Sequence, residues 1–567
     1  MVDNPKKQFH AHDIFIPGVD EGLRLAYAQS LETGRDKPAN ISFLSLSSND
    51  DHRLTSYRLM WKKPAWEQSV TTPTVLAVAD NLEISPSETR INGKVLLNSA
   101  KGARFRNRIV QTNKTLDAEI TAYLTEKSFR NRRSIQADTT DFRDLSLVIE
   151  AKNFFNYYHF LKESFPVLML YKQHNLTGNI IFYSGKGSVA DFVISQCKTW
   201  FPELLEKIVF DASGDSRKFA RALLGLNTSH LYFQCRNRVM KSIDDVGVEV
   251  GRRASVRNFQ MLGMNAYEQP LADFRKHALA LARPDPKPKR RLFVTRKSKR
   301  VRSIDGEEHF LQLLERLNFE TISFEDYSTL EQAKLVAEAE AVVILHGAGI
   351  TNMLYAQPGC HFIELSNLQT LKKRYGDFLP LAIASGAHYC HVFLDHDFDD
   401  PDTVPSIALH GLRGVRMSQF QSQVTASWIA ALLHPEEFEE ARRECAELND
   451  QRDFSKLTTQ LDKHSHLLQH LADAHVWTAN CLNDGRDLTG SLDALRRALI
   501  LAPRRHPLIK RILTLAHRIE DKTAFDQACL HARRYGGEDM QAFFQQNGWI
   551  FHVTNSNSTP SEPIHQR

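Results

Sequence analysis

The sequence predicts an α/β fold made of two successive units of alternating strands and helices, followed by an all-helical region. Strand and helix patterns alternate from about residue 144 to residue 282, and again from residue 290 to residue 394. Three prolines in the segment ARPDPKPK (residues 282–289) separate the two units, which is typical of a linker. After residue 434 the strand signal disappears, and apolar residues recur at helical spacing.

Length and composition narrow the class of protein. A chain of 567 residues exceeds what one hydrophobic core usually supports, so several domains are expected. The content of 42% hydrophobic and 25% charged residues excludes collagenous, largely disordered and disulfide-stapled chains. No run of about 18 apolar residues predicts a membrane span, and the first ten residues lack the apolar part of a secretory signal. The seven cysteines are scattered without a CxxC pair, which favours reduced thiols in the cytoplasm over a disulfide or zinc framework. A net charge of +5 is too small to indicate a nucleic-acid partner.

Composition also divides the chain into segments. A polar, weakly patterned start precedes the first α/β unit, and a polar tail rich in Ser, Asn and Pro follows the helical region. The expected segments are residues 1–40 (poorly ordered), 41–282 (first α/β domain), 283–434 (second α/β domain), 435–550 (helical region) and 551–567 (disordered tail).

Short apolar runs bounded by turn residues predict the strands, and apolar residues every three to four positions predict the helices. A β-rich start over residues 74–97 opens the first unit. Its later strands are expected at residues 145–150, 179–183, 207–210 and 229–233, and its helices at 155–173 and 189–200. In the second unit, strands are expected at residues 291–295, 320–323, 341–345, 361–365 and 386–392, and helices at 307–317, 330–339 and 351–356. Two such units would leave a cleft between them.

The helical region contains one recognisable repeat. Residues 474–503 resemble a tetratricopeptide repeat, with Trp477 early, Gly485 at the turn and Pro503 at the end. The helix pairs on either side fit this pattern more loosely. Such pairs bury their apolar faces only by stacking, so about three are needed for a stable array. A generic helical bundle is the alternative.

The most informative segment spans residues 341–367. A buried strand runs into His346, Gly347, Ala348 and Gly349, and a helix opens directly behind them. Small residues let the backbone approach a ligand closely, and the free amides of a helix start attract a phosphate or diphosphate. His346 can donate to, or partly neutralise, the same oxygens.

Polar residues downstream complete this pattern. Thr351 and Asn352 add short donors, and Glu364 ends the next strand, where a carboxylate can accept both hydroxyls of a ribose. Phosphate donors followed by a carboxylate indicate nucleotide binding. The third glycine of the dinucleotide fingerprint and the Gly-Lys of a P-loop are both missing, so a glycine turn that only packs a strand against a helix is the alternative.

Two motifs suggest a known family. The run HGAGITNMLYAQPG with FIEL behind it (residues 346–365) resembles the hallmark of glycosyltransferase family 61. NYYHF at residues 156–160 is similar to the family's N-Y-x-H-W motif, although Phe160 stands where Trp is common. FVTR at residues 293–296, followed by Arg300 and Arg302, resembles its strand and Ser-Arg element. The resemblance covers about residues 74–395.

The resemblance implies a GT-B fold, in which two Rossmann-like domains face a cleft. The second domain would hold a nucleotide-sugar, most often a UDP-sugar, and the first an acceptor such as a surface polysaccharide, for instance of a capsule, or a glycolipid. The family transfers sugars with inversion, which needs a base on the acceptor hydroxyl and stabilisation of the departing diphosphate. No metal or other cofactor is expected, because a helix dipole and cationic side chains can replace the metal.

Individual residues take roles under this resemblance. Arg296 is the first candidate for a bidentate diphosphate contact, with Arg300 behind it. His159 is the candidate base, since histidine titrates near neutral pH, and Glu163 lies one helical turn later, where it would orient or replace it. The alternative for His159 is a histidine hydrogen-bonded within the fold. The DxD pattern at residues 395–399 is interpreted as a solvated acidic loop and not as a metal site.

The function expected from sequence is therefore an inverting glycosyltransferase of the cytoplasm, or one bound peripherally to the inner face of a bacterial inner membrane. The helical region would dock protein partners or the acceptor chain. Two alternatives stay open. A nucleotide-sugar epimerase or hydrolase of GT-B type would act without an added acceptor, and a non-catalytic assembly scaffold would tolerate loss of His159 and Glu163.

Overall fold

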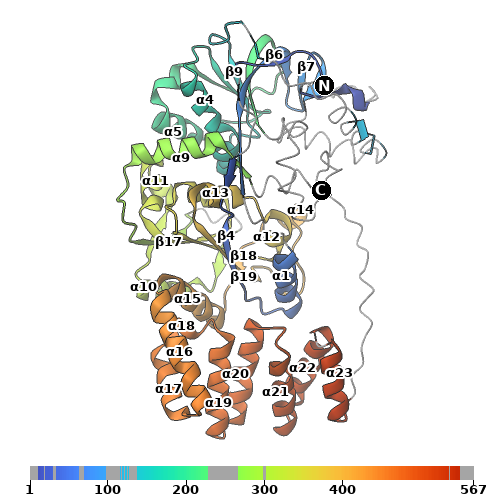
Figure 1. The fold of residues 1–567 in the computed structure, drawn as a ribbon, viewed down its shortest axis with the longest axis vertical. Coiled ribbons are helices and arrows are strands. Elements are labelled where there is room, and N and C mark those ends of the chain that lie inside the picture. The colour runs from blue at the N-terminus through green and yellow to red at the C-terminus, as the bar shows by residue number, and fades with distance from the viewer. Residues whose placement is uncertain are drawn as a thin grey trace.

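The computed structural model describes residues 10–17, 19–27, 29, 34–62, 69–96, 137–138, 140–227, 266–297, 302–535 and 537–549, and isolated positions between 115 and 126. The molecule is elongated, with the first sheet at the top of Figure 1, the second in the middle and the helical region at the bottom. The predicted α/β class and the all-helical carboxyl-terminal region are confirmed. The expected strand at 229–233 and the expected tail at 551–567 lie outside the described residues.

The first sheet combines a parallel core with an antiparallel extension. Its nine described strands follow the order β1-β8-β7-β6-β12-β9-β10-β11, with β2 on β6. β9, β10 and β11 pair in parallel, and β12 joins them to the antiparallel strands. The bounds are β1 (Ile14–Phe15), β2 (Leu23–Leu25), β6 (Val75–Ile84), β7 (Thr89–Ile91), β8 (Lys94–Leu96), β9 (Leu147–Glu150), β10 (Ile180–Tyr183), β11 (Ile208–Asp211) and β12 (Arg217–Leu226).

The long helix expected over residues 155–173 is broken into three pieces. A π-helical turn, η2 (His159–Ser164), is followed by the 3₁₀ turn η3 (Phe165–Val167) and by α4 (Leu168–Gln173). Pro166 explains the break, because proline has no N–H to donate and its ring clashes with the carbonyl four residues earlier. The other described helices of this domain are η1 (Ala11–Asp13), α5 (Asp191–Trp200), η4 (Pro202–Lys207) and α9 (Gln269–Ala282).

The second sheet has a doubly wound core. Its parallel strands follow the order β16-β14-β17-β18-β19, so the chain leaves β14 in one direction and returns to fill the other side from β17 onward. The strands expected in this unit are confirmed, with ends that differ by a few residues. The bounds are β14 (Arg290–Thr295), β15 (Ile304–Asp305), β16 (Glu320–Ser323), β17 (Ala339–Leu345), β18 (His361–Asn367), β19 (His388–His396) and β20 (Val415–Arg416). The helices are α10 (Glu307–Arg316), η6 (Phe324–Asp326), α11 (Thr329–Ala337), η7 (Ala348–Tyr355), α12 (Leu368–Arg374), α13 (Leu379–Ser385), α14 (Ile407–His410) and α15 (Gln419–Leu433).

Amino-terminal residues complete the second sheet. β4 (Asn40–Ser45) pairs in parallel with β19, and α1 (Asp50–Lys62) packs against α12. Both elements lie in the range expected for the first domain, and Figure 1 shows them in the middle of the molecule. The segment before β4, expected to be poorly ordered, supplies β1, β2 and β3 (Gly34–Asp36). β3 forms a small third sheet with β5 (Ser69–Thr72) and β13 (Ala266–Glu268).

The helical region consists of short antiparallel neighbours. Two apolar cores run through it, and Asp487 caps α20 by accepting a hydrogen bond from the amide of Gly490 at 2.8 Å. α1 fixes the region to the second domain, because Tyr57 Oη donates to the carbonyl of Leu501 at 3.2 Å. The bounds are α16 (Pro435–Gln451), α17 (Phe454–Lys463), α18 (Ser465–Leu468), α19 (Ala472–Asp484), α20 (Leu488–Leu501), α21 (His506–Arg518), α22 (Lys522–Tyr535) and α23 (Gly537–Gln546).

None of the helices in the described part of the chain combines the length and apolar character that crossing a bilayer requires.

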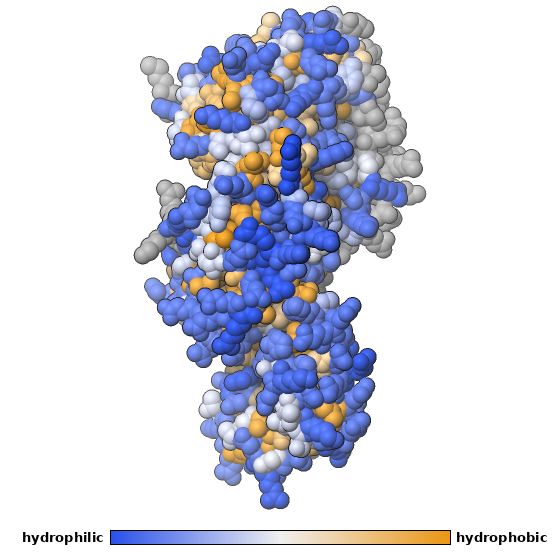
Figure 2. Space-filling view, turned by 90° about the vertical axis from the view of Figure 1, so that its left-hand side faces the viewer, coloured by the Kyte–Doolittle hydropathy of each residue, from blue (hydrophilic) through white to orange (hydrophobic). Residues whose placement is uncertain are grey.

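Figure 2 shows one face of the molecule, on which polar residues predominate and apolar residues form small, separate groups.

Replacing Leu46 tests the contribution of the amino-terminal segment to the second domain. Leu46 follows β4 and is 1% exposed in the core of the second sheet. Leu46→Ala should lower the free energy of unfolding in urea by about 2–4 kcal/mol, because it removes buried methyl groups and leaves a cavity. Leu409→Ala is the matched control, since Leu409 is 81% exposed. Equal effects of the two changes would contradict this role.

Candidate active site

The carboxyl edge of the second sheet has a topological switch point between β14 and β17. Connections leave these neighbouring strands in opposite directions, which opens a crevice where open α/β sheets bind ligands. Arg296 follows β14 directly, and His346 follows β17. The two residues that the sequence analysis places at strand ends therefore flank the same crevice.

A cavity of about 510 Å³ lies at this point and is lined by both α/β domains. α11 and the start of η7 contribute from the second domain, and α5 and the residues before η2 contribute from the first. Its lining includes Tyr157, Gln196, Val294, Arg296, Arg302, Gln332, Ile344, Ala348, Gly349 and Asn352. A cavity of this size, mainly apolar with a few converging polar groups, is typical of a small-molecule site.

Two half-buried arginines, Arg296 and Arg302, reach the cavity, whose wall also includes Glu325. Arg302 Nη1 donates to the carbonyl of His346 at 2.9 Å, and Arg296 Nη2 donates to the same oxygen at 3.4 Å. Burial lowers the pKa of Arg296, although the charge of Glu325 partly opposes this shift. Burial, together with the charges of Arg296 and Arg374, lowers the pKa of Arg302 to about 10. Neither guanidinium forms an ion pair within the described residues. Neighbouring cations that repel each other favour an anionic ligand.

Basic residues close to Arg296 and Arg302 in the sequence do form ion pairs. Arg290 pairs with Glu320, Arg291 with Glu340 and Lys297 with Asp326. The described basic residues between Arg290 and Arg302 thus comprise three cations in ion pairs and two arginines directed into the cavity. Arg300, a candidate diphosphate contact from sequence, lies outside the described residues.

Gly347 has a steric reason to be glycine. Its backbone is extended, with φ of 160°, a conformation open to any residue. A Cβ at this position would, however, overlap the Arg296 guanidinium and lie 3.0 Å from Arg302 Nη1. Glycine therefore lets both arginines close on the backbone before η7. Ala348 and Gly349 continue along the cavity wall, where a Cβ on Gly349 would lie 3.2 Å from Ile344 Cδ1.

Two polar residues of η7 are buried. Asn352 is 1% exposed, accepts a hydrogen bond from Tyr157 Oη at 2.6 Å and donates to Gln332 at 3.2 Å. Its side chain thus connects the two domains, although it also lines the cavity. Thr351 is fully buried, and its hydroxyl has no hydrogen-bond partner in the described part of the chain. The ligand contacts expected for both side chains stay predictions.

Glu364 is buried behind His346. Its Oε1 lies 2.7 Å from His346 Nδ1, and its Oε2 accepts a hydrogen bond from Tyr389 and lies 3.6 Å from His391 Nδ1. Burial opposes ionisation, but the charges of His346 and His391 and the hydrogen bonds from His346 and Tyr389 outweigh it and lower the pKa of Glu364. Both oxygens are engaged, so this geometry fits positioning of His346 better than the ribose contact expected from sequence.

His159 and Glu163 meet at the start of η2, on the first domain. His159 Nδ1 lies 3.0 Å from Glu163 Oε1, and His159 Nε2 lies 2.8 Å from Lys152 Nζ. Burial raises the pKa of Glu163, but the hydrogen bond from His159 and the charges of His159, Lys162 and Lys152 lower it overall. The predicted one-turn spacing thus brings the pair into contact. Lys152, which the sequence analysis does not single out, completes the group.

Aromatic contacts connect His159 to the second domain. The ring of Tyr158 lies 5.1 Å from that of His159 and 5.1 Å from that of Phe378, which in turn lies 5.7 Å from the ring of His346. Tyr158 Oη also donates to the carbonyl of Asp377 at 2.6 Å. Burial raises the pKa of the Asp377 carboxyl, which lies at the same domain boundary.

Only the start of the acidic run at residues 395–399 differs from the predicted solvated loop, because β19 ends at His396 and Asp399 behind it is exposed. Asp395 lies in β19 and accepts hydrogen bonds from Ser47 Oγ at 2.7 Å, from the amide of Ser48 at 2.8 Å and from Gln421 Nε2 at 2.8 Å. Its carboxylate joins three segments of the second domain, because the strand continues further than the apolar pattern indicates.

Residues 157–363 match the model of the Glycosyltransferase 61 family. The chain carries a glycosyltransferase family 61 domain. The match begins in the His159 motif, continues through Arg296 and His346, and ends one residue before Glu364. It confirms the enzyme class that the motifs suggest, and a glycosyltransferase implies a sugar donor and an acceptor. No curated protein matches the chain.

Glu268, which precedes α9 near Lys162 and Glu163, gives a pH-dependent prediction. Burial is the main cause that raises its pKa from the ordinary value of 4.5 to about 7. Between pH 4.5 and about 7, Glu268 is ionised in the unfolded chain but still protonated in the folded protein. The free energy of unfolding therefore falls as the pH rises through this range. Glu268→Gln should therefore raise the free energy of unfolding at pH 8 by about 1–3 kcal/mol relative to wild type, and much less at pH 5.

Denaturant unfolding of both proteins at the two pH values measures this difference. Glu203→Gln is the matched control, because the Lys172 hydrogen bond outweighs burial and lowers the pKa of Glu203. That control should not gain stability at pH 8. A pH-independent effect of Glu268→Gln would contradict the raised pKa.

Proposed function

We propose that this protein is an inverting glycosyltransferase of GT-B architecture that transfers a sugar from a nucleotide diphosphate donor, a UDP-sugar, to a surface polysaccharide or glycolipid. The observation that carries the proposal is the pair of half-buried arginines, Arg296 and Arg302, at the switch-point cavity. Two guanidiniums that form no ion pair within the described residues match the charge of a diphosphate, which Arg binds in bidentate geometry.

The donor would occupy the second domain. Its diphosphate would lie against Arg296, Arg302 and the backbone after Gly347, and the nucleoside would fill the cavity of about 510 Å³. His346, held through Nδ1 by Glu364, would direct Nε2 toward the same phosphate oxygens. These fixed positive charges would stabilise the diphosphate as it leaves, which is the largest electrostatic requirement of the reaction.

The acceptor would approach from the first domain. His159, with Nδ1 facing the Glu163 carboxylate, would accept the proton of an acceptor hydroxyl at Nε2 once that hydroxyl takes the place of Lys152 Nζ. The hydroxyl oxygen would then form a bond to the anomeric carbon while the bond from that carbon to the diphosphate oxygen breaks. One displacement of this kind inverts the anomeric configuration.

The helical region would have a docking role. We infer that its tetratricopeptide-like helices bind partner proteins or the acceptor chain, because α1 and α15 attach this region firmly to the donor domain. Action in the cytoplasm, peripherally at the inner face of a bacterial membrane, fits a donor that is made there.

Nucleotide binding tests the donor site. Calorimetric titration with UDP, GDP, CMP and dTDP should give binding of one nucleotide to wild type. Arg296→Ala and Arg302→Ala should each weaken it about 10–100-fold, because each removes a charge-assisted hydrogen bond of about 1.5–3 kcal/mol. Arg290→Ala is the matched control, since Arg290 pairs with Glu320 on the surface. If no nucleotide binds wild type, or if all three variants bind alike, the donor site is not at the arginine pair.

Replacing His159 tests the base. His159→Ala should lower the turnover number for transfer by about 10²–10⁴-fold while nucleotide affinity stays within a factor of two or so, because the base acts on the acceptor. His466→Ala, a change at an exposed histidine of the helical region, should leave both values unchanged. Full activity without His159 would assign the proton transfer to another group. Donor turnover that needs no acceptor would favour an epimerase or hydrolase.

A further inference from the structure

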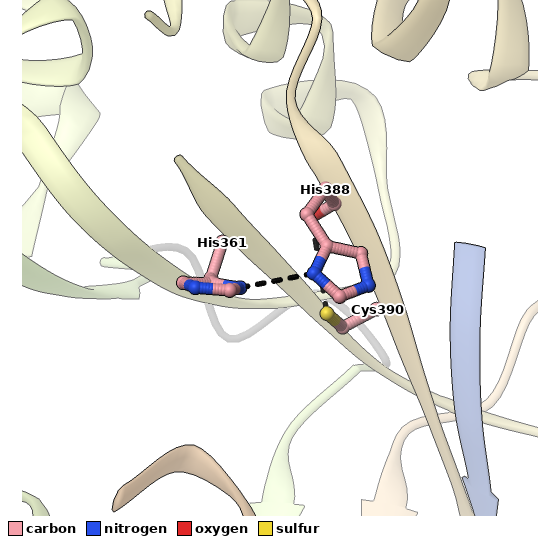
Figure 3. Close-up of side chains that lie close together, drawn as sticks. All are labelled: His361, His388 and Cys390. Carbon is pink, nitrogen blue, oxygen red and sulfur yellow. Dashed lines mark hydrogen bonds between the residues drawn. The ribbon is translucent and has the colours of Figure 1, made fainter. Parts of the chain in front are cut away.

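Three side chains with metal-binding atoms meet at the opposite, amino-terminal edge of the second sheet. His361 begins β18 and His388 begins β19, and the two residues are direct partners in the parallel register. Cys390 lies two residues further along β19, so it shares their face of the sheet. Figure 3 shows the two rings side by side with the Cys390 sulfur beneath that of His388. Their possible ligand atoms all lie within 4.8 Å of one another.

The spacing of these atoms suits a tetrahedral ion. His361 Nδ1 and His388 Nδ1 are 3.1 Å apart. Tetrahedral zinc with bonds of about 2.0–2.1 Å to nitrogen places two such nitrogens about 3.3 Å apart, so the rings hold nearly the required separation. Imidazole and thiolate are the ligands that zinc prefers, whereas magnesium and calcium prefer oxygen.

Neighbouring groups hold two members of the cluster, Cys390 and His361, as outer hydrogen-bond partners hold metal ligands. Ser42 Oγ, on β4, donates to Cys390 Sγ at 3.3 Å, and the carbonyl of Leu432, on α15, accepts a hydrogen bond from the His361 ring. A neutral ring that donates one N–H to a carbonyl keeps its other nitrogen as a lone pair. His388 Nε2 is buried and has no hydrogen-bond partner within the described residues.

The three side chains that would bind the ion include one thiol, Cys390, which is 0% exposed. A bound cation would displace the thiol proton to solvent and form a metal–thiolate bond, so its charge would be partly neutralised in this buried place.

A second cavity gives access for a further ligand. It has a volume of about 390 Å³, and His361 forms part of its wall together with Trp428, Leu432, Phe438 and Glu439. These residues belong to α15 and α16, where the second domain meets the helical region. A water molecule in this cavity would complete a four-coordinate ion.

We propose that His361, His388 and Cys390 bind a zinc ion, with water as the fourth ligand, and that this ion joins the starts of β18 and β19. The site lies at the end of the sheet away from the arginine pair, so its role is structural and separate from sugar transfer. It also differs from the sequence expectation, which reads the scattered cysteines as plain reduced thiols. The site has a single cysteine, and its two histidines come from two different strands. The sequence therefore contains no CxxC spacing that would predict a metal site here.

Cobalt substitution tests the site on the full chain. After chelator treatment, titration with Co²⁺ should give one equivalent of bound metal and a thiolate-to-cobalt charge-transfer absorption. Cys390→Ser should abolish that absorption, and His388→Gln should weaken Co²⁺ binding at least tenfold. Cys360→Ser is the matched control, because Cys360 is equally buried beside His361 but lies outside the cluster. It should keep the absorption.

Zinc should compete with cobalt for the site and raise the thermal unfolding midpoint of wild type but not of His388→Gln. Should Cys390→Ser fail to fold, the His388→Gln titration and the wild-type spectrum still decide the question. Absence of the charge-transfer band in wild type, or its survival in both Cys390→Ser and His388→Gln, would overturn the proposal and leave a hydrogen-bonded histidine pair.

Discussion

The buried carboxylate of Glu364 organises the carboxyl edge of the second sheet. It fixes the His346 ring through Nδ1, while Tyr389 and His391 on the neighbouring strand hold it from the other side. A charge buried this deeply is tolerated only with several partners, so each of these residues supports the others. The backbone carbonyl of the same residue, His346, is the oxygen to which both cavity arginines donate. The contacts of Glu364 and of the two arginines therefore meet at His346.

The two α/β domains are held together by more than the linker. One continuous apolar core runs from the first sheet through α9 into η7 and α13 of the second domain. Polar contacts follow the same boundary, where Tyr157 donates to Asn352 and Tyr158 to the carbonyl of Asp377. The two adjacent tyrosines of the His159 motif therefore connect the domains, and they place His159 beside the second domain. One short motif thus contributes packing as well as the candidate base.

The fold could be predicted from sequence where the signal is local. The strands β14 and β17 are short apolar runs bounded by turn residues, and such runs mark buried parallel strands in any context. β4 could not be predicted from its local sequence, because it is only partly buried and its partner β19 lies far along the chain. The same distinction holds for the candidate site. Arg296 and His346 could be predicted because they are polar residues at the ends of local strand patterns. The contacts of Glu364 could not, because they involve side chains of the adjacent strand and depend on the register between the two strands.

The course of the amino-terminal segment has a mechanical consequence. The chain begins in the first sheet, crosses to the second to form β4 and α1, and returns to the small sheet and the first sheet as β5 and β6. Together with the proline-rich linker, these crossings tie the two halves at several separate points. A single tether would allow one half to swivel freely about the other. Several attachments permit bending about one axis and resist torsion, so any opening of the cleft to admit a donor would be a restricted, repeatable movement.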